Sequence, residues 1–206
     1  FKRLIEKISN GVDLEKSETK ENINEINNFS ERKVNYELVT SENKLIKVLE
    51  ICNEKSEIAI DCETNSLNFK TGNLVGHNIK FDMNVLRQNH NGNIKVFPVD
   101  DTMCMSYCIN LGKVQNHKLD TLAQIELNYT TIKYEDLCGK GVNQKTFDLI
   151  NPLEALNYAA EDSDVALALY QNLKLRLMSN KKNFVYQKLE RELISVLSDI
   201  ENEGII

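Results

Sequence analysis

The sequence predicts an α/β domain in which short strands come first and helices dominate the second half. Three observations support this prediction: a length of 206 residues with 41% hydrophobic residues, a short apolar strand at residues 57–61, and apolar residues at three- and four-residue spacing from residue 101 onward. A chain of this length can bury one core of ordinary size. We therefore expect a single domain with flanking helices.

The first half begins with a polar segment and then changes character. Residues 1–34 are rich in Asn, Lys, Glu and Ser, which predicts a linker or pre-domain segment. From Tyr36 the pattern predicts a strand at residues 36–40 and a helix at residues 42–52 capped by Ser41. The apolar strand at residues 57–61 follows and ends in an acid.

The second half is mostly helical. Residues 78–88 predict a helix, and residues 95–97 predict a strand that runs into Asp100 and Asp101. Further helices are expected at residues 101–110, 118–127, 152–159 and 161–179. The tail at residues 183–203 repeats the helical spacing and predicts an apolar stripe that needs a partner outside this chain.

Composition and net charge argue against several kinds of binding. A net charge of -6 and a pI near 5.2 argue against binding nucleic acid through overall charge, because phosphate contact normally requires a basic surface. Acids gathered around divalent cations would reconcile an acidic chain with a phosphate substrate. The five cysteines show no metal-ligand spacing, and no apolar run is long enough for a membrane span, so we expect neither a zinc site nor a membrane partner.

The first candidate site is a pair of acids at the end of the apolar strand. Asp61 and Glu63 stand two residues apart, which places both carboxylates on the same face of a strand. Two carboxylates held close repel each other, and a divalent cation is the usual partner that offsets this repulsion. Taken alone, the pair also fits a solvated loop start.

Two further segments carry candidate residues. Asp82 falls on the first turn of the helix predicted after Asn78, and Tyr158 and Asp162 share one helix face because they are four residues apart. Each segment alone is equally compatible with surface acids and a core aromatic.

Taken in order, the three segments resemble the three motifs of the DEDDy exonucleases, and most closely the 3'-5' proofreading exonuclease domain of family-A, DNA polymerase I-like enzymes. The resemblance covers most of residues 36–180. It extends to Asn65-Ser66-Leu67, residues 118–123, the Gly139-Lys140-Gly141 turn and residues 158–165.

This resemblance implies a fold and a domain order. The fold would be RNase H-like (DnaQ-like), a mixed β-sheet flanked by helices, with the exonuclease domain at residues 35–180. Residues 191–204 resemble the helix that opens the polymerase domain of that family, so residues 181–206 are expected to lead into a polymerase domain in cis.

The resemblance also implies a metal mechanism. Asp61, Glu63 and Asp162 would hold one Mg²⁺, while Asp61 and Asp82 would hold a second, and Mn²⁺ would substitute for either ion. Tyr158, together with Glu63, would orient the attacking water.

The implied substrate is a single-stranded or frayed DNA 3' end. Leu67 would wedge between the last two bases and Tyr134 would stack nearby. Asn78 would donate to the scissile phosphate region, and His77 stands where relatives often carry Gln.

The chain departs from the family pattern between the first two motifs. Relatives have two more strands and a helix there, whereas Asn73-Leu74-Val75-Gly76 is followed directly by His77 and Asn78. We expect either a truncated sheet or a missing segment. The amino-acid sequences of the motifs and the high Asn and Lys content most resemble those of plastid (apicoplast) DNA polymerases of malaria parasites. This resemblance implies a plastid location.

Two alternatives within this fold stay open, and one outside it ranks last. The chain could be a free-standing, RNase D-like exonuclease that acts on RNA, or a catalytically silent domain that only buttresses a polymerase. The persistence of all four acids and Tyr158 disfavours the silent domain. A generic α/β scaffold without a nucleic-acid role would require all these matches to be coincidental.

Overall fold

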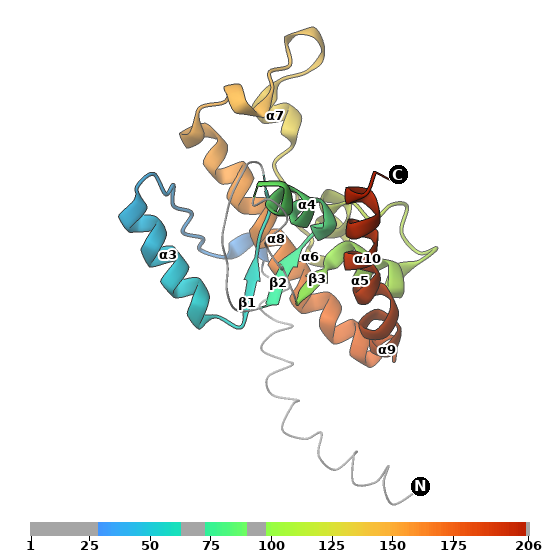
Figure 1. Ribbon diagram of the computed structural model, residues 1–206. Helices are drawn as coiled ribbons and strands as arrows, with labels where there is room; N and C mark the ends of the chain where they lie inside the picture. The colour runs from blue at the N-terminus through green and yellow to red at the C-terminus, as the bar shows by residue number, and fades with distance from the viewer. Residues whose placement is uncertain (1–28, 63–72, 90–97, 205–206) are drawn as a thin grey trace, which may run out of the picture.

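The computed structural model describes residues 29–62, 73–89 and 98–204. Its sheet has three parallel strands in the order β1 (Glu57–Ala59), β2 (Asn73–Gly76) and β3 (Val99–Asp101) (Figure 1). Ala59 pairs with Val75, and Gly76 pairs with Asp101. The predicted α/β class is confirmed, but the described strands pair only in parallel, whereas the prediction was a mixed sheet.

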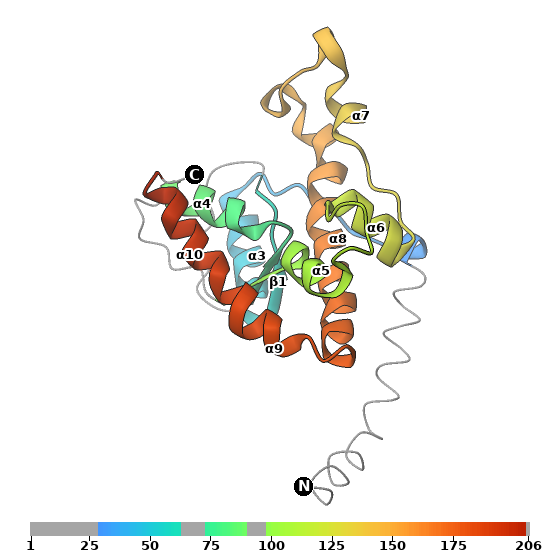
Figure 2. The same ribbon diagram turned by 90° about the vertical axis from the view of Figure 1, so that its right-hand side faces the viewer.

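The sheet separates two apolar clusters. Ile60, Leu74 and Val99 belong to the cluster that contains the buried residues of α4 (Ile79–Asn89) and Ile194 of α10 (Arg191–Asn202). Val75 belongs to the other cluster, with α5 (Thr102–Asn110), α6 (Leu119–Leu127) and α8 (Pro152–Ser179). Figure 2 shows α4 and α10 on one side of the strands and α5, α6 and α8 on the other.

The longest element is α8 (Pro152–Ser179). Proline suits the first helical turn, and the side chain of Asn151 caps the helix by accepting a hydrogen bond from the Leu153 N–H at 2.9 Å. The prediction of separate helices at residues 152–159 and 161–179 was wrong, because the Ala159-Ala160 junction contains no helix breaker. The predicted site residues Tyr158 and Asp162 therefore lie on one continuous helix.

The remaining elements surround this frame. They are η1 (Phe29–Glu31), α3 (Glu42–Glu54), α7 (Tyr134–Cys138), η2 (Gly141–Asn143), η3 (Phe147–Leu149), α9 (Asn183–Val185) and the π-helical η4 (Tyr186–Glu190). Within the described ranges, no helix is both long and apolar enough to cross a membrane.

Two predictions for the first half need correction. Residues 36–40 form no strand; instead the Tyr36 hydroxyl donates to the Asp164 carboxylate at 2.8 Å, so side chains and not a strand ladder hold this segment against α8. The strand predicted at residues 95–97 falls outside the described residues, and the paired strand begins at Val99. Ser41 does precede α3, but its side chain makes no capping hydrogen bond.

The C-terminal helix α10 packs against α4 and β3. The Arg87 guanidinium donates to Ser198 Oγ at 2.8 Å, and the Arg191 guanidinium donates to the Val99 carbonyl at 2.7 Å. The predicted apolar stripe is present on the opposite side of the tail: Phe184 is 70% exposed, Leu189 55% and Val196 48%.

Candidate active site

Two of the predicted acids, Asp61 and Asp82, lie together at the carboxyl end of the sheet. Asp61 follows β1, and Asp82 stands on the first turn of α4. The main-chain N–H of Cys62 donates to Asp82 Oδ1 at 2.8 Å, which ties α4 directly to the residue after Asp61. Parallel strands place their carboxyl ends at one edge, where α/β proteins commonly bind ligands.

Burial shapes the electrostatics of this pair. Asp82 is only 3% exposed. Burial raises the pKa of its carboxyl from 3.8 to about 7, the hydrogen bond from Cys62 opposes this rise, and the nearby Asp61 carboxylate adds to it. Asp61 is exposed, yet the protein atoms around it also raise its pKa. Both groups therefore resist carrying charge unless a positive partner joins them.

The third segment forms one wall of a groove. Tyr158 and Asp162 on α8 face the start of α6 and the segment that leads into α7. The groove has a volume of about 510 Å³ and is lined by Lys118, Leu119, Asp120, Thr131, Ile132, Lys133, Tyr134, Glu135, Tyr158 and Asp162. Tyr134 meets Tyr158 edge to face, with ring centroids 6.2 Å apart.

The two halves of the site lie at the same end of the molecule. In Figure 1, the arrowheads of the strands point toward the end of α8 near which α7 lies. Among the described residues, no three His, Cys, Asp or Glu side chains lie close enough together to hold a metal ion. The structure therefore does not bring Asp162 together with Asp61 and Asp82 as one ligand cluster. Glu63 and Leu67 fall outside the described residues, so the four-acid site and the wedge remain predictions.

The predicted substrate residues His77 and Asn78 lie at the end of β2. His77 Nδ1 is 2.8 Å from Thr102 Oγ1, and burial lowers the pKa of its imidazole to about 4, so the ring is neutral at physiological pH. Asn78 is exposed and has a φ of 60°, a left-handed conformation that asparagine tolerates. His77 thus joins β2 to α5, while the Asn78 side chain stays accessible.

Sequence reasoning missed the role of Asp101. Its buried carboxylate accepts hydrogen bonds from the N–H groups of Asn78 and Ile79, each at 3.1 Å, and of Met103 and Cys104, at 2.8 and 3.3 Å. One side chain therefore fixes the first residues of both α4 and α5. The signal was present as an acid at a strand-to-helix junction, which is a capping position.

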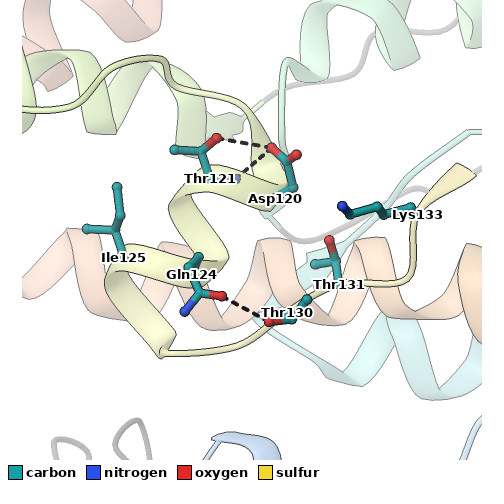
Figure 3. Close-up of a pocket in the computed structure, with 7 residues that line it drawn as sticks. All are labelled: Asp120, Thr121, Gln124, Ile125, Thr130, Thr131 and Lys133. Atoms are coloured by element: carbon teal, nitrogen blue, oxygen red, sulfur yellow. Dashed lines mark hydrogen bonds between the residues drawn. The ribbon is translucent and has the colours of Figure 1, made fainter.

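A second pocket continues the groove along α6. It has a volume of about 330 Å³ and is lined by Asp120, Thr121, Gln124, Ile125, Thr130, Thr131 and Lys133 (Figure 3). Thr130 Oγ1 donates to Gln124 Oε1 at 2.9 Å and closes one side of the pocket. Because Asp120, Thr131 and Lys133 line both pockets, the two form one continuous surface beside Tyr158.

Comparison with known proteins links this geometry to a family. A family described as 3'-5' exonuclease matches residues 70–178. DNA polymerase I of Rhizobium leguminosarum is 40% identical over 131 residues, covering 64% of this chain and 12% of that protein. DNA polymerase I of Pseudomonas aeruginosa is 40% identical over 135 residues, covering 64% of this chain and 14% of the relative.

A third relative spans more of the chain. DNA polymerase I of Borreliella burgdorferi is 25% identical over 231 aligned residues, covering 91% of this chain and 25% of the relative. That alignment is longer than the chain itself, so the relative has residues with no counterpart here. The chain thus spans a quarter or less of the length of these three relatives.

The family match covers more than half of the chain and includes Asp82, Tyr158 and Asp162. The small parallel sheet flanked by helices agrees with the RNase H-like fold of that family. This chain therefore belongs to the family of 3'-5' exonuclease domains found in DNA polymerase I-type, family-A polymerases.

Proposed function

We propose that this chain removes nucleotides one at a time from a DNA 3' end by hydrolysing the terminal phosphodiester with two divalent cations, Mg²⁺ or Mn²⁺. The observation that carries the proposal is the Asp61–Asp82 pair at the carboxyl end of the sheet, where Asp82 has a pKa of about 7. Carboxylates that resist carrying charge without a positive neighbour fit a divalent cation bound through oxygen ligands.

The resemblance to the exonuclease family assigns a role to each of these residues. When bound, the cations would supply positive charge to the phosphate and lower the pKa of a water molecule. Asp61 and Asp82 would hold the cations, with Glu63 and Asp162 completing the ligand set. Tyr158 orients the attacking water from the wall of the groove.

Substrate contacts divide between the groove and the sheet end. Tyr134 offers an exposed aromatic face beside Tyr158, which suits stacking on a base of any identity. Leu67 would separate the last two bases, and Asn78 would donate to the phosphate. His77 supports the site through Thr102.

The test is digestion of a 5'-labelled single-stranded DNA in the presence of Mg²⁺. We expect stepwise shortening from the 3' end that EDTA abolishes and that the Asp61→Asn/Glu63→Gln double variant lacks. The matched control is Glu50→Gln/Glu54→Gln on α3, which makes the same acid-to-amide changes at two exposed positions and should leave activity unchanged.

Other outcomes would support the alternatives. If wild type and the double variant are equally inert while circular dichroism shows both folded, the silent buttressing domain becomes the better account. If a single-stranded RNA of the same sequence is shortened much faster than the DNA, the RNase D-like activity replaces the DNA proofreading proposal.

We further propose that the domain proofreads for a polymerase domain in cis. The named relatives are DNA polymerase I proteins, and the exposed stripe on α9 to α10 offers a surface for a following domain. In a longer protein that carries the polymerase domain, amide exchange around Leu193 and Val196 should be slower than in this chain alone. Equal exchange rates would contradict the docking.

We propose a plastid location because the motif sequences resemble those of apicoplast DNA polymerases of malaria parasites. Immunofluorescence against a plastid marker in the source cell tests it. A cytosolic or nuclear signal would contradict the location without affecting the proposed chemistry.

A further inference from the structure

A second buried acid lies directly beside Asp162. Glu161 is only 4% exposed and faces the segment that follows α6. Its Oε1 accepts a hydrogen bond from the Tyr129 hydroxyl at 2.5 Å, and its Oε2 accepts one from the Ile132 N–H at 2.7 Å. A buried carboxylate is costly unless it is hydrogen-bonded, and here both oxygens are used to hold one short segment.

That segment becomes a wall of the groove. Residues 131–135 line one side, and Tyr158 and Asp162 on α8 line the other. Glu161 lies on α8 next to Asp162. Helix α8 therefore carries Tyr158 and Asp162 on one wall and also binds the opposite wall through Glu161. The two bonds of Glu161 therefore fix the separation between the walls, including the 6.2 Å between the Tyr134 and Tyr158 rings.

Tyr129, which donates to Glu161, is also held by a ring contact on its other side. The Tyr129 ring meets the Phe29 ring edge to face, with centroids 4.9 Å apart. The hydrogen bond to Glu161 raises the pKa of Tyr129 to about 12, so its hydroxyl remains a donor throughout the physiological range. Tyr129 is thus held on both sides, and Ile132 follows three residues later.

We infer that Glu161 is a positioning residue that sets the width of the groove receiving the terminal nucleotide. The inference rests on the proposed exonuclease function, because the groove includes Tyr158 and Asp162. Glu161 does not touch the substrate; it acts through Ile132 and Tyr129. Losing it should weaken capture of the DNA 3' end more than it slows the chemical step.

Two substitutions separate this role from general stability. Glu161→Gln keeps one acceptor for the Ile132 N–H and gains an amide that can donate to the Tyr129 oxygen, so the wall should stay in place. Glu161→Ala removes both bonds. Glu154→Ala is the matched control, because Glu154 is an exposed acid on the same helix.

The experiment measures kcat and KM on a 5'-labelled single-stranded DNA with Mg²⁺, together with Kd for the same DNA by fluorescence anisotropy in an Asp61→Asn background. We expect Glu161→Ala to raise KM and Kd about tenfold, with kcat changed less than about threefold. Glu161→Gln and Glu154→Ala should stay within about threefold of wild type on every parameter.

Three results would overturn the inference: an unchanged Kd for Glu161→Ala, equal losses for Glu161→Gln and Glu161→Ala, or a fall in kcat without a rise in KM. The anisotropy measurement requires no cleavage. Failure of the proposed function, seen as wild type that binds but does not shorten DNA, is therefore distinct from failure of the positioning role.

Discussion

The end of the sheet and the groove beside α8 are built in opposite ways. At the sheet end, Asp82 and Asp101 are almost fully buried and are fixed by main-chain hydrogen bonds. In the groove, Lys133 and Tyr134 are exposed. The difference indicates that Asp82 and Asp101 are held rigidly by main-chain hydrogen bonds, whereas the wall of the groove at Lys133 and Tyr134 is open to solvent. Substitutions at the sheet end should therefore change stability, and substitutions in the groove should change substrate affinity.

The largest effect is expected at Asp101. Replacement by alanine would leave four main-chain N–H groups without their acceptor, and we expect a loss of about 3–5 kcal/mol in the free energy of unfolding. Asp101→Asn should lose less, because its amide oxygen still accepts. Urea unfolding measures the change, with the exposed Asp148→Ala as control. A loss below about 1 kcal/mol would show that α4 and α5 begin correctly without this carboxylate.

The second effect concerns Asp82 and pH in the absence of divalent cations. Its folded pKa is raised from 3.8 to about 7, so protonation favours the folded state. That stabilisation is fully present below pH 4 and is lost as the pH rises toward 7. Asp82→Asn, which keeps an acceptor for Cys62, should escape this loss and be about 2 kcal/mol more stable than wild type at pH 8.

Thermal unfolding in EDTA at pH 4.5 and pH 8 checks this prediction. The advantage of Asp82→Asn should shrink at the lower pH, and Mg²⁺ at pH 8 should stabilise wild type more than the variant. An advantage of equal size at both pH values would contradict the assigned cause, because it would not depend on the Asp82 proton.

Comparison of the predicted elements with the structure shows which parts of the fold the sequence alone could predict and which it could not. The apolar strand at residues 57–61 and the helical spacing of residues 161–179 are local patterns; the strand formed at Glu57–Ala59, and residues 161–179 are helical as part of the longer α8. The hydrogen bonds that Asp101 accepts from Asn78 and that Asp164 accepts from Tyr36 join residues 23 and 128 positions apart. The local sequence marks Asp101 as a capping residue of α5 but does not encode its bonds to Asn78 and Ile79, and it does not encode the contact of Tyr36 with Asp164, so the segment at Tyr36 was assigned to a strand.

The candidate site divides in the same way. Asp82, Tyr158 and Asp162 were predicted because they fall at motif spacing; the structure places Asp82 at the carboxyl end of the sheet and the other two on the groove wall, and their catalytic role stays a prediction. Glu161 and its bonds to the segment after α6 carried no such signal, because a glutamate on a helix is usually exposed.

In the groove, Tyr134→Ala should act on substrate affinity. The ring is 37% exposed, so its removal should cost little stability, whereas loss of a stacking partner should raise KM about tenfold. Steady-state kinetics on single-stranded DNA measure the change, with Tyr107→Ala, another exposed tyrosine, as control. An unchanged KM with a large loss of stability would contradict the division between the sheet end and the groove, because Tyr134 would then be a structural residue.

The smallest effect is expected at Lys133, which lines both pockets. If its ammonium group neutralises one backbone phosphate, Lys133→Ala should reduce the slope of log Kd against log salt concentration by about 0.7, with a roughly twofold weaker Kd at moderate salt. Anisotropy titrations at three salt concentrations give the slope. The exposed Lys47→Ala on α3 is the control, and a slope identical to wild type would place the phosphates elsewhere.

The central claim is that acids at the sheet end drive cation-dependent removal of nucleotides from a 3' end. The most direct measurement is separation of the products released from a 5'-labelled DNA in the presence of Mg²⁺. The account predicts a ladder of DNA shortened by single nucleotides, release of nucleoside 5'-monophosphates, and loss of both in EDTA and in Asp61→Asn/Glu63→Gln. Internal cleavage, or shortening at the same rate in the folded double variant, would contradict it.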